Sequence, residues 1–159
     1  MRWVVNASPV ILLAKIQQAD LLLQIPDAVV IPQSVADEIR AAGPNDSGRH
    51  WLESPPIGVV QADRHLASEV ASWDLGAGES AVVSWALDAG GCEVVIDDLA
   101  GRRCAEVMRI PVTGSLGVIL IAKRRGLVEQ AKPLIESLRR VGAHLSDSLV
   151  QSALNLVGE

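Results

Sequence analysis

Short apolar runs alternate with segments of helical periodicity along most of the chain. Residues 2–6, 28–31, 93–96 and 110–113 are rich in Val and Ile, which predicts buried β-strands. Between these runs, apolar residues recur at the spacing of a helix face, which predicts helices. Strands that alternate with helices indicate βαβ units, so we expect an α/β fold with a mostly parallel central sheet.

Several polar and special residues mark where the helices should begin and end. Ser8-Pro9 is typical of a helix start, with Ser8 as the cap and the helix continuing to Ile16. Residues 43–56 are rich in Gly, Pro, Asn and Ser, which predicts a loop, and residues 57–61 are expected to form an edge strand. Further helices are expected at 20–24, after Pro32 through Ile39, and at 79–89, 99–108, 114–125, 130–140 and 146–157, the last capped by Ser146. No linker or repeat divides the sequence, so we expect residues 1–159 to form a single domain.

The composition limits how the protein recognises other molecules. Apolar residues make up 49% of the chain, but it contains four Trp and no Tyr or Phe, so aliphatic side chains must fill the core. Binding of nucleic acid through stacked aromatic rings is therefore not expected. Cys92 and Cys104 match no metal-binding or disulfide spacing and are expected to be small core residues. No apolar stretch approaches the roughly 20 residues that cross a bilayer, so we expect a cytoplasmic protein without membrane contact.

Charge is distributed unevenly along the sequence. Residues 1–101 hold 5 Lys and Arg against 14 Asp and Glu, whereas residues 102–159 hold 9 against 5. The net charge of −5 excludes a uniformly basic surface. The asymmetry is consistent with a negative pocket beside a positive rim, and equally with a division along the sequence that has no counterpart in space.

Oxygen-bearing side chains follow the predicted strands. Asn6 ends the first strand, Asp97 and Asp98 end the clearest strand, and Thr113 ends the last one, with Ser115 close behind. Ligands of parallel sheets collect at the carboxyl ends of the strands, so these side chains should lie close together. Two glutamates on helices join the candidate set: Glu38 and Glu79.

Grouped carboxylates raise each other's pKa unless a cation lies between them. Oxygen ligands favour Mg²⁺ or Mn²⁺, which can activate water and stabilise the charge on a phosphodiester. Simpler interpretations exist for each acid. Asp97 or Asp98 can cap the next helix, Glu79 can favour a helix dipole, and Glu38 can be one solvated charge beside Asp37.

Five segments in a fixed order resemble the successive motifs of PIN domains. They are Val4-Val5-Asn6-Ala7-Ser8-Pro9, Ile31-Pro32 with Asp37-Glu38-Ile39, Leu75-Gly76-Ala77-Gly78-Glu79-Ser80, Val95-Ile96-Asp97-Asp98, and Pro111-Val112-Thr113-Gly114-Ser115-Leu116-Gly117. The similarity runs from Arg2 to roughly Ala153 and is greatest to a prokaryotic subgroup related to VapC-type toxins. The ordered set carries the resemblance, since no single motif is specific.

The resemblance implies a three-layer α/β/α PIN fold and a metal-dependent ribonuclease, often the toxin of a toxin–antitoxin pair and often a homodimer. It implies Mg²⁺ or Mn²⁺ as cofactor, RNA as substrate and an antitoxin protein as partner. Matched motif by motif, the metal-binding positions are Asn6, Glu38, Glu79, Asp97 and Asp98, and the four acids are the catalytic candidates. The substrate-binding candidates are Ser8, Arg102, Arg103, Thr113 and Ser115.

Asn6 departs from the family pattern, since PIN nucleases commonly carry Asp at the end of the first strand. An amide oxygen can coordinate Mg²⁺ but brings no charge, so weaker metal binding is expected. The alternative is therefore a catalytically weak or inactive PIN module that binds a partner or RNA.

Other classes of site have less support. Arg102 and Arg103 follow the aspartate pair within about one helical turn and can face phosphate, whereas the cations 123–125 and 139–140 also fit helix C-termini. His50, His65 and His144 share no spacing with a carboxylate that would indicate a catalytic triad. A receiver-like phosphoacceptor domain would need its acidic pair after the first strand, where this chain has none.

Overall fold

The computed structural model describes residues 1–54 and 58–159, and a sheet of parallel strands forms its centre. The strands are β1 (Arg2–Val5), β2 (Ala28–Pro32), β3 (Val60–Gln61), β4 (Cys92–Val95) and β5 (Val112–Thr113). Their spatial order is β3-β2-β1-β4-β5, and every neighbouring pair is parallel. The predicted α/β fold with a parallel sheet is confirmed.

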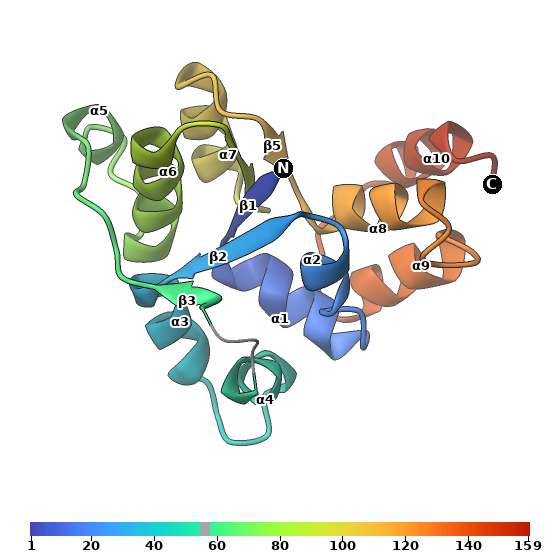
Figure 1. Ribbon diagram of the computed structural model, residues 1–159. Helices are drawn as coiled ribbons and strands as arrows, with labels where there is room; N and C mark the ends of the chain where they lie inside the picture. Colours follow the sequence, from blue (N-terminus) through green and yellow to red (C-terminus); the bar gives the residue numbers. More distant parts are fainter. Residues whose placement is uncertain (55–57) are drawn as a thin grey trace.

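Helices connect and cover the strands. They are α1 (Ala7–Lys15), α2 (Leu21–Gln24), α3 (Gln33–Arg40), α4 (Ser47–Glu53), α5 (Ser68–Ala71), α6 (Ala77–Ala89), α7 (Leu99–Val107), α8 (Ser115–Arg124), α9 (Lys132–Arg140) and α10 (Asp147–Leu156). In Figure 1 the sheet lies between the group α5–α7 (green to yellow) and a second group made of α1, α2 and α8–α10 (blue, and orange to red). Helices on both faces of the sheet match the expected three-layer arrangement.

The core of the sheet is aliphatic, as the composition predicts. Val4 and Val5 on β1 and Val94 and Val95 on β4 are fully buried, because helices cover both faces of the strands. Trp3 and Trp85 add the largest buried side chains. Cys92 and Cys104 are free and buried, which confirms their expected role as core residues.

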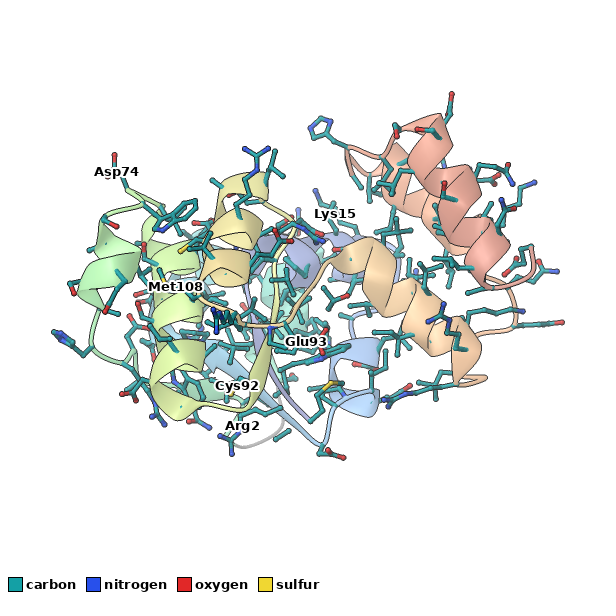
Figure 2. All side chains as sticks on the ribbon, turned by 90° about the horizontal axis from the view of Figure 1, so that it is seen from above. Arg2, Lys15, Asp74, Cys92, Glu93 and Met108 are labelled. Carbon is teal, nitrogen blue, oxygen red and sulfur yellow. The ribbon has the colours of Figure 1, made fainter. Side chains whose placement is uncertain are left out.

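The strand order changes direction at β1: β2 and β3 are added on one side of it, and β4 and β5 on the other. β2 pairs with one edge of β1 and β4 with the other. Such a switch point leaves a crevice at the carboxyl ends of the two central strands, which is where ligands of open α/β sheets bind. The opposite ends of these strands carry Arg2, Cys92 and Glu93, labelled in Figure 2, so those residues lie away from the crevice.

Two local expectations were wrong. Helix α1 begins at Ala7 with Asn6 in the cap position, so Ser8 lies inside the first turn and is not the cap. The predicted loop at 43–56 contains α4, whose first turn is capped by Asp46 accepting from the Arg49 N–H at 2.9 Å and whose Leu52 is buried. One buried leucine and one cap are too weak a pattern to outweigh the surrounding Gly, Pro and Ser.

The edge strand was confirmed only at Val60–Gln61, and Ile57 lies outside the described residues. The short helix α5 has no counterpart among the expected elements. No helix in residues 1–54 or 58–159 has the length and hydropathy needed to cross a membrane.

Candidate metal centre and active-site cleft

The register of the strands brings the predicted polar side chains to one edge of the sheet. Val5 lies opposite Val95, and Val95 lies opposite Thr113. The Asn6 N–H donates to the Val95 carbonyl at 3.0 Å, so the ends of β1 and β4 stay paired up to the site. Residues that follow these strands, including Asn6 and Asp97, are therefore neighbours although the sequence separates them widely.

Asn6, Glu38 and Glu79 form one cluster, called here the Asn6 group. The Asn6 amide donates from Nδ2 to Glu79 Oε1 at 3.1 Å. Glu38 comes from α3 and Glu79 from the first turn of α6. A Cβ placed on Gly78 would lie 2.7 Å from Glu38 Oε2 and 3.1 Å from Asn6 Oδ1, so both oxygens face this glycine. Gly78 therefore lets the backbone of α6 approach the two oxygens closely.

The Asn6 group contains a buried acceptor without a donor and an acid with a raised pKa. Asn6 is only 2% exposed, and its Oδ1 has no hydrogen-bond partner among the described residues. A buried acceptor without a donor costs on the order of 1–3 kcal/mol. Burial, and secondly the charge of Glu79, raise the pKa of Glu38 above its ordinary value. The Glu38 residue as a whole is nonetheless exposed to solvent. A cation between these oxygens would satisfy the amide and relieve the repulsion.

Asp97, Ser8 and Ser115 form a second cluster, called here the Asp97 group. Asp97 Oδ1 accepts from the Ser115 N–H at 2.8 Å, and Oδ2 accepts from the Ser115 hydroxyl at 2.6 Å and the Ser8 hydroxyl at 3.2 Å. Ser115 opens α8, so the carboxylate acts as an acceptor at the N-terminus of that helix. Protein donors thus engage both oxygens of Asp97.

Asp98 is more exposed than Asp97 and caps the following helix. Its Oδ2 accepts from the Gly101 N–H at 2.9 Å, at the first turn of α7. A Cβ on Gly101 would lie 3.3 Å from Glu79 Cγ and 3.6 Å from Asp98 Oδ2, so this turn lies between the two acids. The capping role foreseen for Asp98 exists, and it leaves the Oδ1 of Asp98 without a bond among the described residues.

The remaining substrate-binding candidates differ in their surroundings. The Arg102 guanidinium donates from NH1 to the Ile96 carbonyl at 3.1 Å and approaches Gly114, where Asp97 Oδ1 also lies. Arg103 is exposed, whereas Thr113 is 8% exposed with Oγ1 directed at Gly117. Arg102 therefore adjoins the acidic site and keeps further N–H groups for other acceptors.

A cleft of about 810 Å³ begins at the Asp97 group and runs along α8 toward α10. Asp97, Asp98 and Arg102 line one wall together with Ser8. The opposite wall comes from the segment after α9, including His144, and from α10. In Figure 2 helices α8–α10 form a group on one side of the molecule, which places this wall far from α5 and α6.

His144 is the residue that sequence reasoning missed. It had no spacing relation to any carboxylate, yet the fold places it in the same cleft as Asp97 and Asp98. Gly142 and Ser146 mark a short turn between two helices, which the sequence does show. Nothing in the sequence places that turn against the end of β4.

The donor set suits a hard divalent cation. No three His, Cys, Asp or Glu side chains in residues 1–54 and 58–159 lie together closely enough to hold a metal ion by themselves. The Asn6 group therefore depends on an amide as its third oxygen. Amide and carboxylate oxygens are ligands that Mg²⁺ and Mn²⁺ accept, and the unpartnered Asn6 Oδ1 is the observation that fits such an ion.

A family model described as a PIN domain matches residues 2–159. The chain belongs to the PIN-domain family. No curated protein and no solved structure gave a match. PIN domains are generally nucleases and usually use divalent metals, which supports a hydrolase assignment at a coarse level.

Proposed function

We propose that the protein is an Mg²⁺- or Mn²⁺-dependent endoribonuclease. The observation that carries the proposal is the buried Asn6 Oδ1 without a partner, beside the carboxylates of Glu38 and Glu79. A folded protein keeps such an arrangement at a cost, and a divalent cation removes that cost. Membership of the PIN family supports phosphodiester hydrolysis as the reaction.

Each cluster has a distinct part in the proposed site. Asn6, Glu38 and Glu79 hold the ion. Asp98, with one oxygen free at the neighbouring turn, joins them on the family resemblance and would have to move closer to the ion, since no three acids lie together in the described residues. The bound ion supplies a more acidic water and a positive charge for the phosphodiester. Arg102 lies beside the site and offers N–H donors to phosphate, as does the more exposed Arg103 further along α7.

Asp97 differs from the other predicted ligands because protein groups already bond to both of its carboxylate oxygens. The donors are the Ser8 hydroxyl and the hydroxyl and backbone N–H of Ser115. A carboxylate has about four lone-pair sites, so coordination is still open to it. We assign Asp97 to holding α8 and the β4 end together, and its role as a metal ligand stays a prediction.

Three parts of the proposal rest on the family resemblance. They are the role as toxin of a toxin–antitoxin pair, the antitoxin as protein partner and the homodimeric state. A cytoplasmic location belongs to the same proposal and rests on the sequence. The proposed activity does not depend on any of these parts.

A second candidate function has one observation in its favour. With Asn6 in place of an acid, the Asn6 group brings two negative charges to the cation in place of three. Ligand charge is a main contributor to affinity, so the site is weaker than a fully acidic one. The chain then acts as a PIN module that binds RNA or a protein partner without cutting.

Cleavage of a mixed RNA pool by the purified protein separates the two functions. We expect cutting in Mn²⁺ or Mg²⁺, none in EDTA, and none by Asp98→Asn. Asn remains a good helix cap, so this variant keeps the α7 start and loses only the charge. Asp37→Asn, next to Glu38 on α3 and exposed, is the matched control and should cut normally. Absence of cutting in every metal by folded protein would favour the binding module.

A further inference from the structure

On its α9–α10 side, the cleft has few side chains that can make polar contacts to a substrate. Its titratable lining residues among the described parts of the chain are Asp97, Asp98, Arg102 and His144. Three of these already bond to the protein: Asp97 to two serines, Asp98 to Gly101 and Arg102 to Ile96. The His144 imidazole makes no hydrogen bond within residues 1–54 and 58–159.

The turn that carries His144 is well anchored. Gly142 has a φ of 112°, which an L side chain rarely adopts, and it redirects the chain at the end of α9. The Ala143 N–H donates to the Leu138 carbonyl at 3.0 Å, and Ser146 caps α10 through the Leu149 N–H at 3.2 Å. Ala143 and Leu145 pack against the core on either side of the exposed His144. The imidazole is therefore presented to the cleft from a turn fixed at both ends.

The rest of this wall is apolar. Leu138, Leu145, Leu149 and Leu156 contribute to it, and Leu149 and Leu156 are 47% and 64% exposed. Binding sites are commonly apolar surfaces with a few polar groups that fix the ligand's orientation. A nucleotide seated here would pack its ribose or base on leucine side chains, because no Trp, Tyr or Phe lines the cleft within the described residues.

We propose that His144 binds a phosphate of the RNA strand next to the one that is cut. The proposal rests on the ribonuclease function above. An RNA strand whose scissile phosphate lies at Asp98 and Arg102 can continue along the cleft that these residues line, so that its next phosphate faces His144, which lines the same cleft. His144 donates an N–H to that phosphate, so the strand is held between α7 and the turn before α10.

The test is binding of a fluorescent single-stranded RNA in EDTA, where no cleavage occurs, measured by anisotropy. His144→Ala should weaken binding about tenfold, the scale of one lost hydrogen bond to a charged group. His144→Gln keeps an N–H donor and should recover most of the affinity. His65→Ala is the matched control, since His65 is exposed and lies outside the cleft. With metal added, His144→Ala should raise KM and leave kcat within about twofold.

Equal affinity of His144→Ala and His65→Ala, in protein that melts at the wild-type temperature, would overturn the proposal while cleavage by the wild type continues. A protein partner on the leucine wall would give this outcome. RNA that fails both to bind and to be cut by the wild-type protein would overturn the proposed function, and this inference with it.

Discussion

The two oxygen clusters lie at the ends of adjacent strands but are satisfied to different degrees. In the Asp97 group, two hydroxyls and a backbone N–H bond to one carboxylate. In the Asn6 group, a buried amide oxygen has no partner within the described residues, and burial, together with the nearby charge of Glu79, raises the pKa of Glu38. The first cluster is stable as it stands. We propose that a cation completes the second cluster, which is why we assign the metal to it.

The difference also separates stability from activity. Changes in the Asn6 group should act on metal binding and on cleavage, with small effects on folding. Changes in the Asp97 group should act on folding whether or not metal is present, because α8 depends on the carboxylate. Variants in each group test this division directly.

The largest expected effect is that of Glu79→Gln on cleavage. Gln keeps an acceptor for Asn6 Nδ2 but removes a charge from the metal site, so the rate should fall on the order of 100-fold. Rates are measured with the same RNA under saturating Mn²⁺, and Asp37→Asn serves as the control. A rate within about threefold of wild type would place the metal elsewhere.

Asp97→Ala should have the largest effect on stability. It removes three hydrogen bonds, one of them at the N-terminus of α8, and should lower the free energy of unfolding by about 2 kcal/mol. The loss should be the same in Mn²⁺ and in EDTA. Asp98→Ala, which removes one cap bond, should cost about 1 kcal/mol. Urea denaturation measures the free energy of unfolding of both variants. If Asp97→Ala lost stability only when Mn²⁺ is present, Asp97 would be a metal ligand.

Asn6→Asp should sharpen the comparison by changing the metal-free and metal-bound proteins in opposite directions. The new carboxylate loses the donation to Glu79 and adds a buried charge, so Tm in EDTA should fall. In Mn²⁺ the added ligand charge should raise affinity about tenfold and accelerate cleavage. Thermal melts and a Mn²⁺ titration report the two effects separately. A variant less stable in both conditions, with no gain in Mn²⁺ affinity, would contradict the assignment of Asn6 as a ligand.

The smallest effect concerns the pH dependence of the metal-free protein. The pKa of Glu38 is raised in the folded state, so the folded protein retains this proton to higher pH than the unfolded chain. The resulting penalty grows as pH rises past the ordinary value of 4.5 and is absent well below it. Glu38→Gln should therefore raise Tm in EDTA at pH 7 by about 1–3 °C and have no such benefit at pH 4. An equal gain at both pH values would show that charge is not the cause.

Much of the fold follows from local pattern. The Val- and Ile-rich runs predicted β1, β2 and β4 to within a residue or two, because both faces of these strands are buried and the signal is strong. Helix α4 was missed, since its cap at Asp46 and its single buried leucine are embedded in turn-forming residues. The sequence placed the start of α1 at Ser8, but the Ser8 hydroxyl instead bonds to Asp97 after the neighbouring strand β4, a contact that no local rule predicts.

The candidate site was predictable as a list of residues but not as two clusters. Strand ends and motif order indicated Asn6, Asp97 and Asp98 together. Only the structure separates them into two clusters. Ser115 donates hydrogen bonds to Asp97, whereas the Asn6 amide donates to Glu79. His144 depended wholly on tertiary packing, because the turn before α10 reaches the cleft through the arrangement of α8 and α9.

The most direct test of the metal assignment is a calorimetric titration of EDTA-treated protein with Mn²⁺. We predict binding to the wild type that weakens at least about tenfold in Glu79→Gln and changes little in Asp97→Asn. Binding that survives Glu79→Gln but is lost in Asp97→Asn would assign the ion to the other cluster, and no binding by the wild type would contradict a metal-dependent nuclease.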